Sequence, residues 1–176
     1  MKTPALLQHD TAILILLALA RLILHTATNG NYGFHRDELA MLDDARHLAW
    51  GYVAYPPLVP FLTRIGWEIF GAWLPGLRLF SVLVQCAAMV LVGLMAKELG
   101  GGRGAQIVAA VAAAIAPMAL IMGAMFQYIS FDYFWWVLIG YFVIKRITSG
   151  DPRWWIGIGA AIGLGMMTKY TIIFLI

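Results

Sequence analysis

The chain has 176 residues, of which 62% are hydrophobic and 12% are charged, and its net charge is +3. Soluble domains carry about 25% charged residues, so this composition excludes an ordinary soluble domain and indicates an integral membrane protein. The basic residues are too few and too scattered for nucleic-acid binding, and the single cysteine, Cys86, excludes an internal disulfide framework.

Five apolar segments are each close to the roughly 20 residues that a helix needs to cross a bilayer. They lie at residues 11–28, 77–96, 105–125, 129–146 and 154–176. The first could be taken for a signal peptide, but its apolar stretch is long and contains Arg21, so we interpret it as a retained helix. Together the segments predict an all-α integral membrane protein with a single transmembrane domain over residues 1–176.

The polar stretch at residues 29–74 interrupts this apolar pattern. Residues 37–50 place apolar side chains at helical spacing, and residues 58–70 do so again after Pro56-Pro57. Amphipathic helices of this kind lie on a membrane surface. We therefore expect two short surface helices in this loop.

The distribution of charge predicts the orientation of the chain. Basic residues in short connections mark the cytoplasmic side of a membrane protein. The N-terminus, with Lys2, and the connections at 97–104 and 145–154 are rich in basic residues, whereas acidic residues exceed basic ones in the loop 29–74. We expect a cytoplasmic N-terminus and a loop that faces the outside.

Asp37 and Glu38 form an adjacent acid pair at the start of the first surface helix. Two carboxylates in this position could simply complement the helix dipole. They could also deprotonate an acceptor hydroxyl or bind a divalent cation such as Mg²⁺ or Mn²⁺. Beside them, Arg36 could be a plain surface residue or could bind an anionic headgroup or phosphate.

Three further residues are candidates for the same outer face. Tyr55 precedes the two prolines, which form a rigid turn that could also fix the wall of a groove. Asp132, at the outer start of the fourth segment, could cap a helix or act in function, since a charge at membrane depth is costly. Lys169, about 15 residues into the fifth segment, could extend to the membrane surface or contact a lipid phosphate.

Several short motifs, in this order and spacing, resemble one family. They are HRDEL, WGYVAYPPLVP, LPGLRLFSVL, SFDYFWW, GDPRWW and GLGMMTKYT. From about residue 10 to residue 176 the chain resembles the bacterial branch of the dolichyl-phosphate-mannose protein mannosyltransferase-like family (glycosyltransferase family 39). These are membrane glycosyltransferases of the GT-C fold and include the lipid A aminoarabinose transferases.

The resemblance implies a sugar transferase in the bacterial cytoplasmic membrane that uses a polyprenyl-phosphate sugar as its donor. It implies that Asp37 is the general base for the acceptor, with Glu38 and a possible divalent metal orienting it. Asp132 corresponds to a second outer-face acid of the family, and Lys169 is positioned to meet the donor phosphate. The resemblance leaves the sugar and the acceptor open, and it implies a single inverting displacement.

A non-catalytic scaffold, a lipid-binding subunit or a transport component is the alternative interpretation. A transporter is expected to contain inverted repeats with broken helices, and no such repeat is evident in the sequence. Family members are typically longer than this chain, which ends inside the fifth apolar segment. We therefore expect it to be the N-terminal portion of a longer protein.

Overall fold

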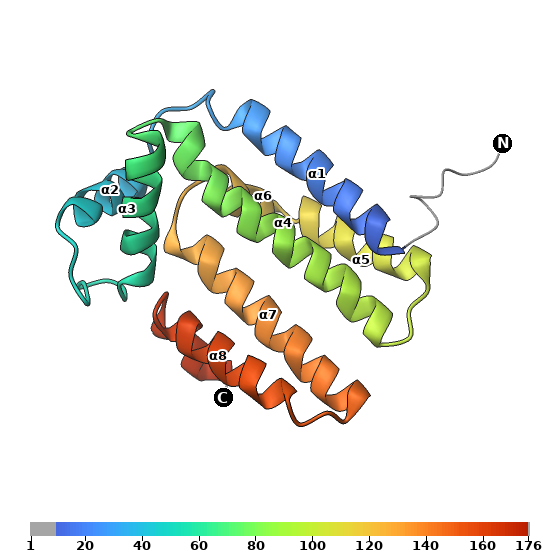
Figure 1. Ribbon diagram of the computed structural model, residues 1–176. Coiled ribbons are helices and arrows are strands. Elements are labelled where there is room, and N and C mark those ends of the chain that lie inside the picture. Colours follow the sequence, from blue (N-terminus) through green and yellow to red (C-terminus); the bar gives the residue numbers. More distant parts are fainter. Residues whose placement is uncertain (1–9, 176) are drawn as a thin grey trace.

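The computed structural model describes residues 10–175, and these residues are almost entirely helical (Figure 1). Lys2 lies outside the described residues. The elements are α1 (Asp10–Thr28), α2 (Arg36–Arg46), α3 (Leu58–Phe70), α4 (Leu74–Glu98), α5 (Arg103–Ile115), α6 (Pro117–Ala124), α7 (Tyr128–Ser149), α8 (Trp154–Met166) and the 3-10 helix η2 (Tyr170–Leu175). The expected all-α class is confirmed, and two short helices lie in the first loop. The first of them ends at Arg46, four residues earlier than the expected range 37–50.

Helix α4 is the centre of the bundle. It packs against α1, α5, α6 and α7, and α8 packs on the far side of α7 (Figure 1). Helices α2 and α3 gather at one end of the bundle, next to the C-terminal end of α1 and the N-terminal end of α4. The connections α4–α5 and α7–α8 lie at the opposite end, where Lys145 Nζ is 3.1 Å from Glu98 Oε1.

Length and apolar composition identify the membrane-crossing candidates among the described residues. Two helices qualify, Thr11–Thr28 and Leu74–Glu98, and α5 with α6 would make a third if the bent pair is one span. One side of α1 exposes large apolar side chains, including Ile15, Leu19 and Ile23, as contact with lipid requires. The expected crossings at α7 and α8 stay predictions.

The third expected segment, 105–125, is not one continuous helix. It breaks at Ala116, and α5 and α6 meet at an angle of 62°. Pro117 lies at the break, because proline has no backbone N–H to donate and its ring clashes with the preceding turn of an uninterrupted helix.

Polar side chains of α1, of α7 and of Asn29, which follows α1, hold the short helix α6. Arg21 of α1 donates to the carbonyl of Ala119 at 2.7 Å, and Asn29 donates to that of Gly123 at 3.0 Å. Ser130 of α7 donates to the carbonyl of Met122 at 2.7 Å. The carbonyls of Met122 and Gly123 belong to the last turn of α6, where a helix leaves its carbonyls without partners of its own. Arg21, which the sequence left without a role, is therefore a structural residue.

The fifth expected segment also ends early, because α8 stops at Met166 and the chain turns into η2. The backbone N–H groups of Thr168 and Lys169 both donate to the carbonyl of Gly165 at 2.9 Å. A Cβ at Gly165 would lie 2.8 Å from Ile172 Cγ1, so only glycine allows η2 to pack this closely against α8. Lys169 thus lies after the helix instead of within it.

Candidate active site

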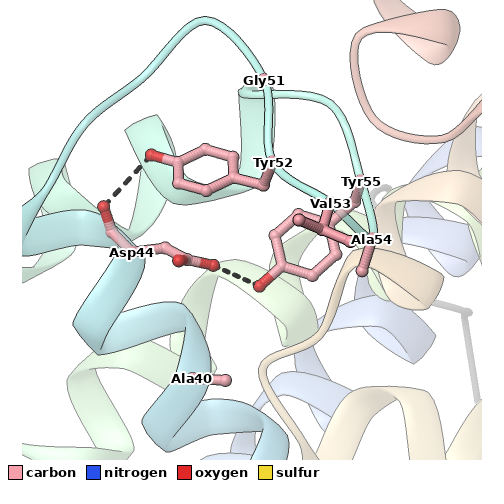
Figure 2. Close-up of a pocket in the computed structure, with 7 residues that line it drawn as sticks. All are labelled: Ala40, Asp44, Gly51, Tyr52, Val53, Ala54 and Tyr55. Carbon is pink, nitrogen blue, oxygen red and sulfur yellow. Dashed lines mark hydrogen bonds between the residues drawn. The ribbon is translucent and has the colours of Figure 1, made fainter.

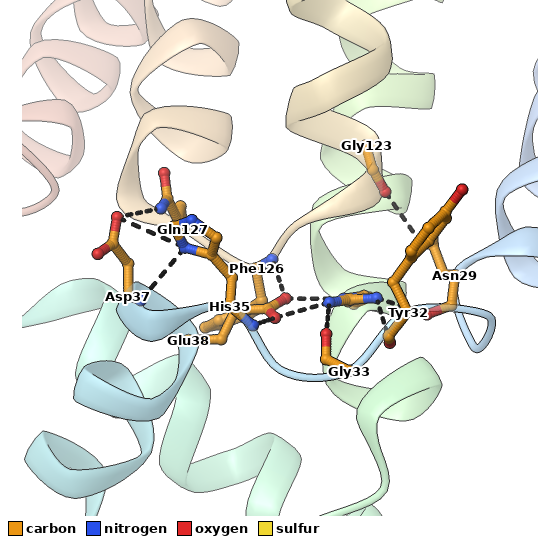
Figure 3. A network of polar contacts seen from close by, with 10 residues as sticks. Asn29, Tyr32, Gly33, His35, Asp37, Glu38, Gly123, Phe126 and Gln127 are labelled. Atoms are coloured by element: carbon orange, nitrogen blue, oxygen red, sulfur yellow. Dashed lines mark hydrogen bonds and ion pairs between the residues drawn. The ribbon is translucent and has the colours of Figure 1, made fainter.

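The acid pair at the start of α2 separates into one buried and one accessible carboxylate. Glu38 is 2% exposed and forms a two-pronged ion pair with Arg78 of α4, with N–O distances of 2.8 and 2.7 Å (Figure 3). Its oxygens also accept the backbone N–H groups of Phe126 and His35, each at 2.8 Å. Four charge-assisted hydrogen bonds leave Glu38 fully satisfied, which fits a residue that positions its surroundings.

Arg78 ties the loop before α2 to the bundle. It is 3% exposed and donates to the carbonyls of Asn29 at 2.6 Å and Gly33 at 2.9 Å, besides Glu38. Sequence reasoning did not select Arg78. The available signal was a lone arginine in the first turns of an apolar helix, since such a charge requires an acidic or carbonyl partner.

Asp37 is the accessible member of the pair. Its side chain is 37% exposed and contacts Arg36 Nε at 3.3 Å and His35 Nδ1 at 3.8 Å. The Gln127 side-chain amide donates to the Asp37 carboxylate from the connection between α6 and α7 (Figure 3). The sequence did not reveal this contact between Gln127 and Asp37, because the two residues lie 90 positions apart in the chain.

The side chain of Arg36 is 91% exposed and forms an ion pair with Asp37. This environment agrees with the plain surface interpretation and leaves the guanidinium free to meet an anion from solution. Its binding of a headgroup or phosphate stays a prediction.

Tyr55 lies in the wall of an open pocket. The Tyr55 hydroxyl donates to the carboxylate of Asp44 (Figure 2). Burial, followed by this hydrogen bond, raises the pKa of the Tyr55 hydroxyl above its ordinary value, so the group stays protonated and remains a donor. Asp44 of α2 thereby fixes the orientation of Tyr55.

Asp132 and Lys169 both lie near the N-terminal end of α7. Asp132 is 8% exposed and accepts the Thr171 hydroxyl from η2 at 2.9 and 3.0 Å. Lys169 Nζ lies 5.0 Å from the centroid of the Tyr128 ring, a cation–π contact. Next to it, the Trp135 indole donates to Thr168 Oγ1 at 2.9 Å, which fixes the segment that carries the lysine.

The start of α7 connects these groups. Gln127 contacts Asp37, and the next residue, Tyr128, packs against Tyr55 with ring centroids 5.4 Å apart and lies under Lys169. The structure therefore brings an accessible carboxylate, a tyrosine wall and a half-buried cation to one end of the bundle. Such a site can accept a proton at one point and stabilise an anion at another.

Glu38 does not fit a metal ligand in this geometry, because its oxygens already accept four hydrogen bonds. Within residues 10–175 no group of three or more His, Cys, Asp or Glu residues is arranged to hold a metal ion. Asp37 is the one member of the expected pair that retains an accessible carboxylate. Metal dependence stays a prediction.

Fold and site together define a multi-pass helical membrane protein with a polar site at one end of its bundle. Residues 54–176 match the dolichyl-phosphate-mannose-protein mannosyltransferase family, and the chain belongs to this family, whose type is that of the GT-C glycosyltransferases. The match includes Tyr55, Asp132 and Lys169 and begins after Asp37 and Glu38. No curated protein and no solved structure was found to match the chain.

Proposed function

We propose that the protein transfers a sugar from a polyprenyl phosphate to an acceptor at the outer face of a bacterial cytoplasmic membrane. The observation that carries this proposal is the placement of accessible Asp37 and half-buried Lys169 on neighbouring sides of the start of α7. Family membership supports a membrane glycosyltransferase with a lipid-linked donor. The geometry of the site supports a choice of the groups that would act on the donor and on the acceptor.

The proposed reaction is a single displacement at the anomeric carbon of the donor sugar. The acceptor oxygen forms the new glycosidic bond as the bond between the sugar and the polyprenyl phosphate breaks. Asp37 takes the proton of the acceptor hydroxyl, and the polyprenyl phosphate leaves with the bonding electron pair. The ammonium group of Lys169 stabilises the charge that develops on this phosphate.

Two residues act without touching a substrate in this scheme, one by positioning the base and the other by positioning Lys169. Glu38 holds the backbone of Phe126, and the next residue, Gln127, holds the Asp37 carboxylate. Asp132 supports Lys169 through its contact with Thr171 in η2, which follows the lysine. We thus assign Glu38 and Asp132 positioning roles and keep the proton transfer on Asp37.

The proposed orientation has the N-terminus in the cytoplasm and the loop 29–74 outside. The charged contacts at the opposite end of the bundle support it, since Lys145 and Arg146 lie over the rings of Trp154 and Trp155 there. Arg153, next to them in the chain, pairs with Asp151. A cysteine accessibility assay would test it. Cysteines placed at exposed Val53 and at exposed Ile147 should react with a membrane-impermeant thiol reagent from opposite sides of sealed vesicles.

Asp37→Asn in the complete gene product tests the reaction. The substitution removes the base and keeps the shape, so the transfer rate from a polyprenyl-phosphate sugar should fall about 10²- to 10⁴-fold. Asp43→Asn is the matched control, because Asp43 is exposed on the same helix and should leave the rate unchanged. Wild-type rates in the Asp37 variant would reject the assignment and favour a non-catalytic membrane component.

A further inference from the structure

An open pocket lies beside the acid end of the site. Its volume is about 780 Å³, within the range of about 300–1,000 Å³ that is typical of ligand sites (Figure 2). The residues that line it are Ala40, Asp44, Gly51, Tyr52, Val53, Ala54 and Tyr55. The pocket lies between α2 and the connection that leads to α3.

The pocket walls combine rigid aromatic rings with an acceptor group. Tyr52 receives the backbone N–H of Ala49 on its hydroxyl oxygen at 3.0 Å and donates to the backbone carbonyl of Asp44 at 3.1 Å. Tyr55 donates to one carboxylate oxygen of the same aspartate. Both phenol rings are thus fixed, with centroids 5.8 Å apart, and among the described residues no donor meets the other Asp44 carboxylate oxygen.

The pocket leads toward the proposed base. Asp37, Ala40 and Asp44 are spaced i, i+3 and i+7, so they share one face of α2. Ala40 and Asp44 line the pocket, and Asp37 lies one turn further toward the start of the helix. A ligand that fills the pocket would direct its edge along this face to Asp37.

We propose that this pocket binds a sugar ring of the acceptor, so that the acceptor is a saccharide. The proposal rests on the transferase function proposed above. Flat aromatic faces pack well against the C–H face of a pyranose, and a carboxylate oxygen accepts hydrogen bonds from the ring hydroxyls. The combination of tyrosines and Asp44 offers both kinds of contact in one pocket.

A peptide acceptor fits the same walls less well. One common way to bind an extended peptide uses unpaired backbone groups at a strand edge. Residues 10–175 contain no strand. In the connection between α2 and α3, which lines the pocket, the backbone N–H of Tyr52 already donates to the carbonyl of Tyr55 at 3.1 Å. The pocket therefore favours a ring with hydroxyl groups.

A binding experiment tests the pocket without requiring turnover. The complete protein in lipid nanodiscs is titrated with methyl pyranosides of glucose, mannose and galactose and observed by saturation-transfer NMR. Ala40→Trp fills the pocket from an exposed position of α2, and it should weaken binding of the preferred glycoside by about tenfold or more. Leu39→Trp is the matched control, since Leu39 is 52% exposed on the same helix and does not line the pocket, and its affinity should equal that of wild type.

Two results would overturn the saccharide pocket. One is the absence of glycoside binding to the wild-type protein, and the other is equal affinity of wild type and the Ala40→Trp variant. Capture of a Ser/Thr-containing peptide that Ala40→Trp abolishes would also overturn it and assign the pocket to a peptide. Thermal unfolding of both tryptophan variants verifies that they are folded.

Asp37→Asn separates this proposal from the transferase function. The variant should bind the glycoside with wild-type affinity and lose transfer. Retained binding with undiminished transfer would reject the catalytic assignment and leave the pocket standing. If Asp37→Asn lost transfer but Ala40→Trp did not weaken glycoside binding, the catalytic assignment would stand and the saccharide pocket would be rejected.

Discussion

Glu38 and Arg78, 40 residues apart in the chain, meet in a two-pronged ion pair that closes the first loop onto the bundle. Both side chains are nearly inaccessible, at 2% and 4% exposed. Glu38 also accepts the backbone N–H groups of His35 and Phe126, and Arg78 also donates to the carbonyls of Asn29 and Gly33. This pair therefore determines the geometry of the loop that carries Asp37.

Replacing Glu38 with alanine should destabilise the protein severely. The substitution leaves the Arg78 guanidinium buried without its counter-charge, which typically costs about 3–5 kcal/mol. Thermal unfolding in nanodiscs measures the loss. Glu68→Ala is the control, because Glu68 pairs with Arg64 on the surface of α3, where such i,i+4 pairs contribute about 0.3–0.5 kcal/mol. Equal losses in the two variants would contradict the structural role of Glu38.

Gln127→Leu should lower the turnover number of transfer by about tenfold and leave the KM of the lipid donor unchanged. The substitution removes the amide that holds the Asp37 carboxylate in place, and misplacement of a catalytic group lowers the rate of the chemical step. Steady-state kinetics with varied donor provides the measurement. An increase in donor KM at constant turnover would place Gln127 in donor binding instead.

Lys169→Met should raise the KM for the polyprenyl-phosphate donor by about tenfold, as expected for the loss of one close ion contact with the donor phosphate. Methionine keeps the length of the side chain, and Lys169→Arg should restore part of the affinity. The control is Lys97→Met at the opposite end of the bundle, where the side chain is exposed. Donor KM values that do not differ between the Lys169 and Lys97 variants would remove the phosphate assignment.

Two glycines of α8 should respond oppositely to replacement by alanine. A methyl group at Gly165 would lie 2.8 Å from Ile172 and 3.2 Å from Trp135, so Gly165→Ala should cost about 1–3 kcal/mol through overpacking. At Gly163 nothing lies within 4 Å of the added methyl, so Gly163→Ala should be neutral or stabilise the helix by up to about 1 kcal/mol. Chemical denaturation in detergent compares the two. Equal stabilities would contradict the close packing of η2 on α8.

Local patterns predicted the helices well, because apolar periodicity reports which face of a helix is buried. The second surface helix begins and ends at Leu58 and Phe70, as the spacing indicated. The break at Ala116 and the early end of α8 were missed, because both depend on packing. Asn29, Arg21 and Ser130 stabilise the short α6, and Ile172 can approach Gly165 only in the folded chain.

The candidate site was predicted only in part, because some of its contacts also depend on packing between distant segments. Charge and position along the chain selected Asp37, Asp132 and Lys169 as residues of one membrane face, and the structure brings them to one end of the bundle. Charge and position along the chain did not reveal that Glu38 forms an ion pair with Arg78 or that Gln127 contacts Asp37. Those partners lie far apart in sequence and belong to different helices, so no local pattern reports them.

The bond between Leu58 and Met167 has a consequence for how the protein is made. The first backbone N–H of α3 donates to the carbonyl of Met167 at 3.0 Å, just beyond the end of α8. During synthesis, which proceeds at about 5–20 residues per second, α3 lacks this partner until more than one hundred further residues have emerged. The loop 29–74 can therefore make this contact only after Met167 has been synthesised, and nascent chains that stop short of Met167 lack it.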